Sequence, residues 1–115
     1  MPFAMNESTQ FISPTKTPEY LAGGKPVVST PIRDVVRHYG QLEGVKIAST
    51  PEEFVAACEE ALDLSHNPES GWLAEADLTL SASSWDTTQA RMAGLIAQLL
   101  GTEEVTAPAL LVAAE

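Results

Sequence analysis

The sequence has few of the residues that define several large classes of protein. It has one cysteine, Cys58, in 115 residues, so no disulfide can form within the chain, and a lone thiol suits a reducing compartment. No apolar run is long enough to span a bilayer, and we find no secretory signal. These absences exclude a disulfide-stabilised secreted domain and predict a cytoplasmic protein with no transmembrane segment.

Basic residues are also scarce. Six lysines and arginines stand against sixteen aspartates and glutamates, which gives a formal net charge of −10. Residues 1–46 have five basic and four acidic side chains, whereas residues 47–115 have one basic and twelve acidic. The negative field argues against nucleic acid and anionic lipid as partners, so only residues 1–46 are expected to attract an anion. The acidic part itself is interpreted as a solvated surface.

Metal ligands are too few and too far apart to form a site. His38 and His66 are 28 positions apart, and no second nitrogen or sulfur ligand stands at a spacing typical of metal sites. We therefore expect no metal and no cofactor. Cys58 falls on an apolar helical stripe, where a small buried hydrophobic residue is expected rather than a nucleophile.

Short apolar segments alternate with helical patterns, which predicts an α/β fold with about three short parallel strands. The strands are expected at residues 1–4, 26–29 and 45–48. The helices are expected at residues 13–22, 31–39, 51–64 and 72–82, with a turn-rich linker at 65–71 and a long last helix capped by Ser83 or Ser84.

Helix 51–64 has the strongest local signals, because Thr50 and Glu53 have the spacing of a capping box. Helix 31–39 is expected to have Thr30 as its cap and Gly40 as its stop. The apolar stripe of helix 51–64 is expected to comprise Phe54, Val55, Cys58, Ala61 and Leu62.

The last helix is expected to present one apolar face. Trp85 on this helix and Trp72 on the preceding one are expected to be packing anchors rather than stacking platforms for a sugar or base. Residues 101–115 are interpreted as a flexible tail, or as a cover for exposed core through Ala107–Val112. The face comprises Trp85, Met92, Leu95, Ile96 and Leu99.

The most informative segment is residues 11–30. Ser13 is a good N-cap and Pro14 suits the first helical position, so a helix is expected to begin there and to point free amides at what precedes it. Such a helix end attracts phosphate, and Lys16 adds a positive charge. Glu19 stands one turn further on the same side, where it could accept hydrogen bonds from a ribose diol, or be an ordinary surface glutamate. Pro18 should shorten or bend this helix near Thr17.

The segment ends in a glycine pair and a strand. Gly23 and Gly24 follow the helix rather than opening one, so they are interpreted as its C-terminal cap and not as a phosphate-binding fingerprint. Residues 25–28 then begin a buried strand.

In this segment the chain resembles the donor-binding motif of retaining nucleotide-sugar glycosyltransferases of the GT-B fold, in the large group 1 family. The resemblance covers about residues 1–100. It implies that Glu19 binds the donor ribose, that Ser13, Thr15 and Lys16 lie at the pyrophosphate, and that Asn6, Glu7, Phe11 and Ile12 lie nearest the donor sugar. The family often has a glutamate where this chain has Phe11, and a Gly-Phe-Gly where it has residues 12–14.

The resemblance implies the C-terminal half of a Rossmann-like donor domain, since a complete enzyme has two such domains and about three times this length. Residues 1–100 would be a partial glycosyltransferase domain and residues 101–115 a tail. The implied activity is hexosyl transfer from a nucleotide sugar to a carbohydrate or lipid-linked acceptor, with the isolated chain inactive. The alternative is a non-catalytic remnant or binding module that pairs with itself or with a separate N-terminal half.

Overall fold

The computed structural model describes residues 1–101, which belong to two compact units. The first unit is Met1–Leu80, and the second begins at Ser81. The expected tail, with its apolar run at residues 107–112, lies outside the described residues apart from Gly101.

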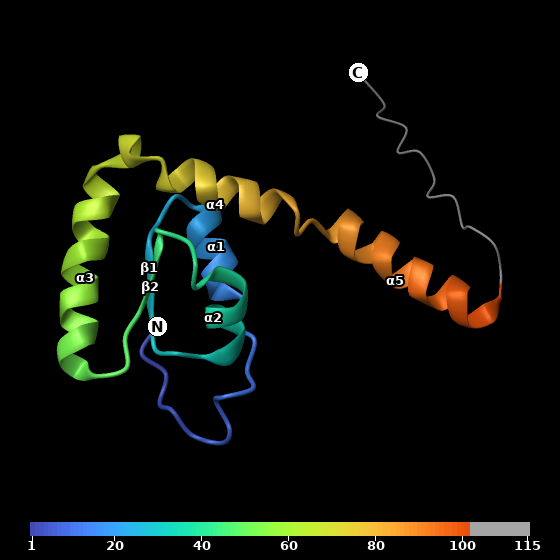
Figure 1. The fold of residues 1–115 in the computed structure, drawn as a ribbon, viewed down its shortest axis with the longest axis horizontal. Coiled ribbons are helices and arrows are strands. Elements are labelled where there is room, and N and C mark those ends of the chain that lie inside the picture. The colour runs from blue at the N-terminus through green and yellow to red at the C-terminus, as the bar shows by residue number, and fades with distance from the viewer. Residues whose placement is uncertain (102–115) are drawn as a thin grey trace. The chain divides into compact units, whose positions relative to one another are not determined.

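The first unit is built on a two-stranded parallel sheet. Strands β1 (Val27–Ser29) and β2 (Val45–Ile47) pair with Val27 opposite Val45 and Ser29 opposite Ile47. Helix α2 (Arg33–Tyr39) connects them, so β1, α2 and β2 form a βαβ unit (Figure 1). The predicted α/β class and parallel pairing are therefore confirmed.

The prediction of a third strand at residues 1–4 is wrong for the part of the chain that the structure describes. The nitrogen of Met1 donates to the carbonyl of Val28 at 2.6 Å, and the amide of Thr30 donates to the carbonyl of Met1 at 3.3 Å. These two bonds have the pattern of one rung of parallel pairing. The rung does not extend, because Pro2 has no N–H and the amide of Phe3 turns back to the carbonyl of Met1.

Helix α1 (Lys16–Ala22) begins three residues later than the predicted start. Thr15, not Ser13, holds the N-cap position, and its side chain makes no capping bond. Pro18 explains the difference, because in a longer helix its ring would meet the carbonyl of Pro14, four residues earlier. The helix therefore starts where Pro18 falls in the first turn, and the expectation that this proline shortens it is confirmed.

The predicted glycine cap of α1 is confirmed. The amide of Lys25 donates to the carbonyl of Tyr20, and the amide of Gly24 donates to that of Leu21, both at 2.9 Å. Gly24 has a φ of 68°, a conformation that favours glycine. This arrangement is a Schellman motif, which turns the chain directly from α1 into β1.

Helix α2 also starts later than predicted. Ile32 is its N-cap residue and its side chain cannot cap, so the predicted cap at Thr30 is wrong. The hydroxyl of Thr30 instead donates to the carbonyl of Phe3 at 2.9 Å, which holds the N-terminal segment. The predicted stop at Gly40 is confirmed.

Helix α3 (Pro51–His66) has the predicted capping box and ends two residues later than expected. Its buried face is centred on Ala57 and Ala61, whereas the side chains of Val55 and Leu62 are about 60% exposed. Cys58 is only partly buried. The predicted apolar stripe is therefore rotated, because a sheet of two strands covers only a narrow part of a helix.

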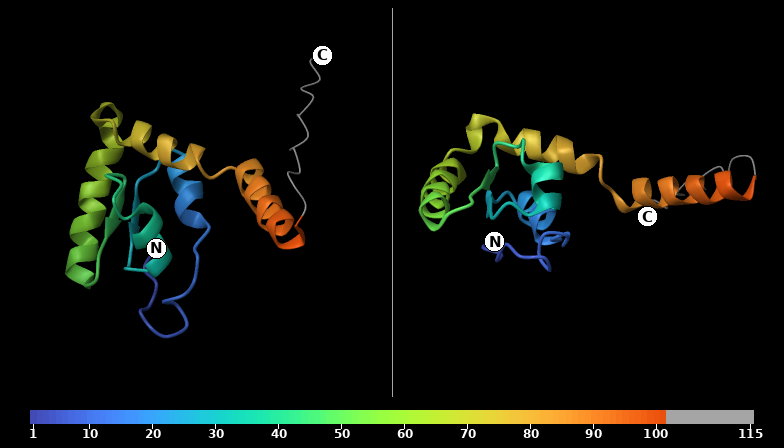
Figure 2. Two further views of the ribbon diagram at one scale, coloured as in Figure 1. Left: turned by 45° about the vertical axis from the view of Figure 1, so that its right-hand side comes forward. Right: turned by 60° about the horizontal axis from the view of Figure 1, so that its bottom comes forward.

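Helices cover both faces of the sheet. Helix α3 lies on one side, and α1 and α2 lie on the other (Figures 1 and 2). Lys46 of β2 faces α3, where its ammonium lies 3.3 Å from a carboxylate oxygen of Glu60. The main core comprises Leu21, Val27, Ile32, Val35, Leu42, Val45, Trp72 and Ala76.

A 3₁₀ turn (Pro68–Ser70) connects α3 to helix α4 (Trp72–Ser81). The Trp72 side chain is 1% exposed, which confirms its predicted role as a packing anchor. A carboxylate oxygen of Glu75 accepts a hydrogen bond from the amide of Glu43 at 2.9 Å, so α4 also holds the loop that precedes β2.

The second unit contains helix α5 (Trp85–Leu100), capped by Ser84 and ended by Gly101. Of the two predicted caps, Ser83 and Ser84, the structure shows Ser84, and the helix is long, as expected. Trp85 is 88% exposed, so it is not a packing anchor among the described residues. None of the helices within residues 1–101 combines the length and apolar character needed to cross a membrane.

Candidate functional site

Lys16 and Glu19 form an ion pair on the exposed side of α1. The Lys16 Nζ and a Glu19 carboxylate oxygen are 2.9 Å apart, and more than half of each side chain is exposed. The hydrogen bond that Lys16 donates, together with the negative charge of Glu19, raises the pKa of Lys16 above its ordinary value. The structure thus brings these two predicted residues together, with Lys16 charged at neutral pH.

The amides at the start of α1 are fewer than the sequence suggests. Pro18 is the third helical residue and has no N–H, which leaves the amides of Thr15, Lys16 and Thr17 at this end. The side chains of Ser13 and Thr15 are exposed, whereas that of Thr17 is fully buried. Helix α1 therefore offers an anion one charged side chain and a short row of amides.

The loop before α1 contains the residues expected near a sugar, and two of them have structural roles. The side chain of Asn6 accepts hydrogen bonds from the amides of Ser8 and Thr9, at 3.0 and 3.1 Å, and so fixes a turn. Ile12 packs against the main core. Glu7 is exposed and Phe11 is 69% exposed, so these two side chains are accessible to a ligand.

A cavity that the sequence reasoning missed lies where β1 and β2 end. It has a volume of about 630 Å³, within the range of small-molecule sites. None of the residues predicted to bind the donor lines it. The only sequence signal was the set of short polar residues that follow each strand, such as Thr30 and Ser49. The lining residues are Pro2, Phe3, Ala4, Met5, Thr30, Ser49, Thr50, Pro51, Phe54 and Val55.

The electrostatics of this cavity disfavour an anion. Its lining is uncharged, and the adjacent start of α3 is already occupied by the chain's own carboxylate. Glu53 accepts hydrogen bonds from the amides of Ser49 and Thr50, at 2.8 and 3.2 Å. A phosphate would have to displace this carboxylate, so the cavity suits a neutral, largely apolar group.

Within residues 1–101, no three histidine, cysteine, aspartate or glutamate side chains lie close enough together to hold a metal ion.

Comparisons with protein-family models, with curated proteins and with solved structures find no match to this chain.

Proposed function

We propose that this chain supplies part of the donor-nucleotide site of a nucleotide-sugar-dependent glycosyltransferase of the hexosyltransferase type. The acceptor would be a carbohydrate or a lipid-linked saccharide in the cytoplasm. The chain would be the C-terminal half of a Rossmann-like donor domain of the GT-B fold. It contributes binding groups and no catalytic residue, so the isolated chain is expected to be inactive.

The observation that carries this proposal is the exposed ion pair of Lys16 and Glu19 on a helix fixed by its own C-terminal turn. The Schellman motif joins α1 to the buried strand β1, so the position of the pair is determined by the core. One oxygen of Glu19 accepts the bond from Lys16, and the other remains for a ribose hydroxyl.

In the proposed site, neighbouring residues bind different parts of the nucleotide-sugar donor. Glu19 orients the nucleoside through its ribose, and Ser13, Thr15 and Lys16 lie toward the pyrophosphate. Charge develops on this leaving group as the glycosidic bond breaks, and positioned donors compensate for it. Of the residues expected nearest the sugar, Glu7 and Phe11 are the accessible ones.

Replacing Glu19 with alanine is expected to weaken the binding of uridine or guanosine diphosphate about tenfold or more, because a charge-assisted hydrogen bond is lost. Calorimetric titration measures this affinity, and circular dichroism checks that the helix content is unchanged. Glu59→Ala, at an exposed glutamate of α3, is the matched control and should bind as the unsubstituted chain does. Equal affinity of the Glu19 variant would remove the basis of the proposal.

A second candidate is a non-catalytic module that pairs with a copy of itself or with a separate N-terminal half. It is favoured by the apolar side chains that α5 leaves exposed among the described residues, including Met92, Leu95 and Ile96 at 55–59%. This function predicts a dimer or larger species in light scattering at micromolar concentration. A stable monomer at that concentration would count against self-association.

A further inference from the structure

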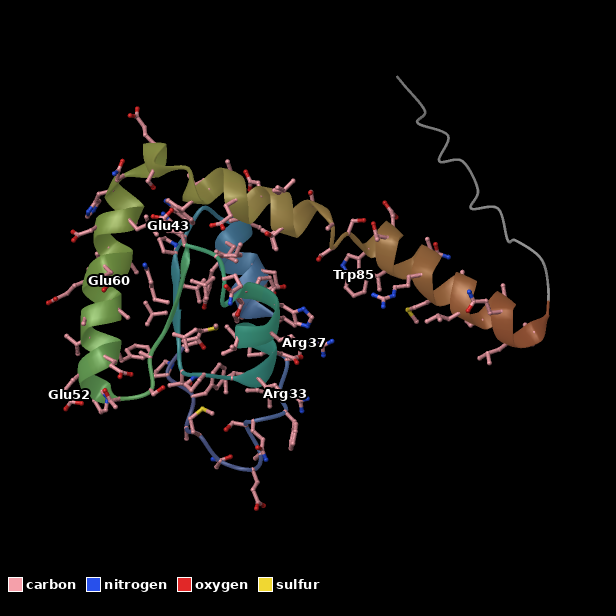
Figure 3. The ribbon with its side chains drawn as sticks, viewed as in Figure 1. Arg33, Arg37, Glu43, Glu52, Glu60 and Trp85 are labelled. Carbon is pink, nitrogen blue, oxygen red and sulfur yellow. The ribbon has the colours of Figure 1, made fainter. Side chains whose placement is uncertain are left out.

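Arg33 and Arg37 form an exposed cationic pair on α2 that nothing in the described part of the chain neutralises. They stand four residues apart, and Figure 3 shows both side chains extending from α2 on the side away from the strands. Neither has an ion pair or hydrogen-bond partner within residues 1–101. Lys16 and Lys46 each pair with a glutamate, whereas Lys25 and Arg91, like the two arginines of α2, form no ion pair within residues 1–101.

The absence of an acidic partner is notable in a chain with a net charge of −10. Like charges four residues apart on a helix repel each other, so the two arginines slightly destabilise α2. Asp34, the one acidic residue on α2, is partly buried and forms no ion pair with either arginine. The fold thus maintains two adjacent guanidinium groups that remain available to an anion.

The topology places Arg33 at the end of the sheet where α1 begins. Helix α1 is seven residues long and β1 three, and each spans about 10 Å. Only four residues join them, and the chain reverses its direction there. The first residue of α1 and the last residue of β1 therefore lie at the same end of the sheet. Three residues separate the end of β1 from the start of α2, which lies on the same side of the strands as α1 (Figures 1 and 2). The carboxyl ends of parallel strands are where α/β sheets bind ligands.

We propose that Arg33 and Arg37 bind a diphosphate group. Each guanidinium presents a planar fork that matches a pair of phosphate oxygens, and two forks one helical turn apart suit a ligand with two adjacent phosphates. A compact anion is favoured over an extended polyanion because the negative field of the chain repels every added charge. The diphosphate could belong to a nucleotide or to a lipid-linked substrate, and the assignment to the nucleotide donor rests on the proposed function.

Arg33 and Arg37 would also provide positive charge that the proposed donor site otherwise has little of. The ammonium of Lys16 is already hydrogen-bonded to Glu19, so its charge is partly neutralised. Arg33 and Arg37 supply the uncompensated positive charge that a diphosphate requires, without displacing an internal ion pair.

The experiment is a calorimetric titration of the full chain with inorganic pyrophosphate at low ionic strength. Arg33→Ala and Arg37→Ala are each expected to weaken binding about tenfold, and Arg33→Lys less, because lysine keeps the charge but not the fork. Arg91→Ala, at an exposed arginine of α5, is the control and should bind unchanged. Circular dichroism establishes that each variant is folded. No binding by the folded chain, or equal binding by the alanine variants, would overturn the proposal.

Three further titrations separate the sources of the diphosphate and the two proposals. Glu19→Ala should weaken nucleoside diphosphate binding without weakening pyrophosphate binding, because pyrophosphate has no ribose and the released Lys16 ammonium keeps its positive charge. Unchanged nucleotide binding by that variant would contradict the donor site and leave the arginine site supported. Binding to phosphatidylcholine vesicles that contain a polyprenyl diphosphate, lost in the Arg33 and Arg37 variants, would assign the site to a lipid-linked substrate. Equal binding to vesicles with ordinary anionic lipid would show a nonspecific charge patch and overturn the proposal.

Discussion

Replacing Trp72 with alanine is expected to lower the free energy of unfolding of the first unit by about 3–5 kcal/mol. The indole is 1% exposed and belongs to the main core, with Leu21, Val45 and Ala76. Its removal leaves a cavity where α4 packs against the main core. Since small domains have only about 5–15 kcal/mol of stability, this loss would be a large share of the total. Urea denaturation followed by circular dichroism measures it.

Two variants test the physical reason. Trp72→Phe should cost clearly less, because most of the buried ring remains and the indole nitrogen has no hydrogen-bond partner to lose within residues 1–101. Trp85→Ala, at a tryptophan that is 88% exposed, should change stability by no more than about 0.5 kcal/mol. If Trp72→Ala were as mild as Trp85→Ala, Trp72 would not be the anchor of α4.

Replacing Gly44 with alanine should lower the free energy of unfolding by about 1–3 kcal/mol through overpacking. An added Cβ would lie 2.6 Å from one ring carbon of Trp72 and 3.0 Å from another. The clash is with a fully buried ring, so neither the ring nor the backbone before β2 can move freely. Gly94→Ala is the control, since its Cβ would meet nothing within 4 Å and alanine favours a helix by about 0.8–1 kcal/mol.

Gly44 and Trp72 contact each other, so the effects of Gly44→Ala and Trp72→Ala on the free energy of unfolding should not add. In the Trp72→Ala background, Gly44→Ala should cost little, because the ring that the Cβ would meet is gone. Thermal or urea unfolding of both single variants and the double variant gives the coupling. Additive effects would show that Gly44 is required for a reason other than room for the indole.

Local signals in the sequence predicted the elements that depend on neighbouring residues. Thr50 and Glu53 identify the start of α3 because both partners of the capping box lie within four residues. The glycine cap of α1 was predictable for the same reason. The start of α1 was not, because a good N-cap at Ser13 competes with the ring of Pro18, and the steric effect dominates.

Features that depend on distant segments were predicted less well. The segment at residues 1–4 is apolar enough for a strand, but pairing with β1 stops after one rung. At the candidate site, the spacing of Lys16 and Glu19 correctly placed them on one side of a helix. The cavity near Phe3 and Phe54 was missed because it joins segments that are about 50 positions apart in the sequence.

The most direct test of the proposed donor site is a nuclear magnetic resonance titration of the isotopically labelled chain with uridine and guanosine diphosphates. We expect saturable shifts of the amide resonances of Thr15, Lys16, Thr17 and Glu19, with further shifts at Arg33 and Arg37. These shifts should be lost for the α1 residues in Glu19→Ala. No shifts at α1, or shifts confined to the cavity that Phe3 and Phe54 line, would contradict the central claim that α1 binds a nucleotide.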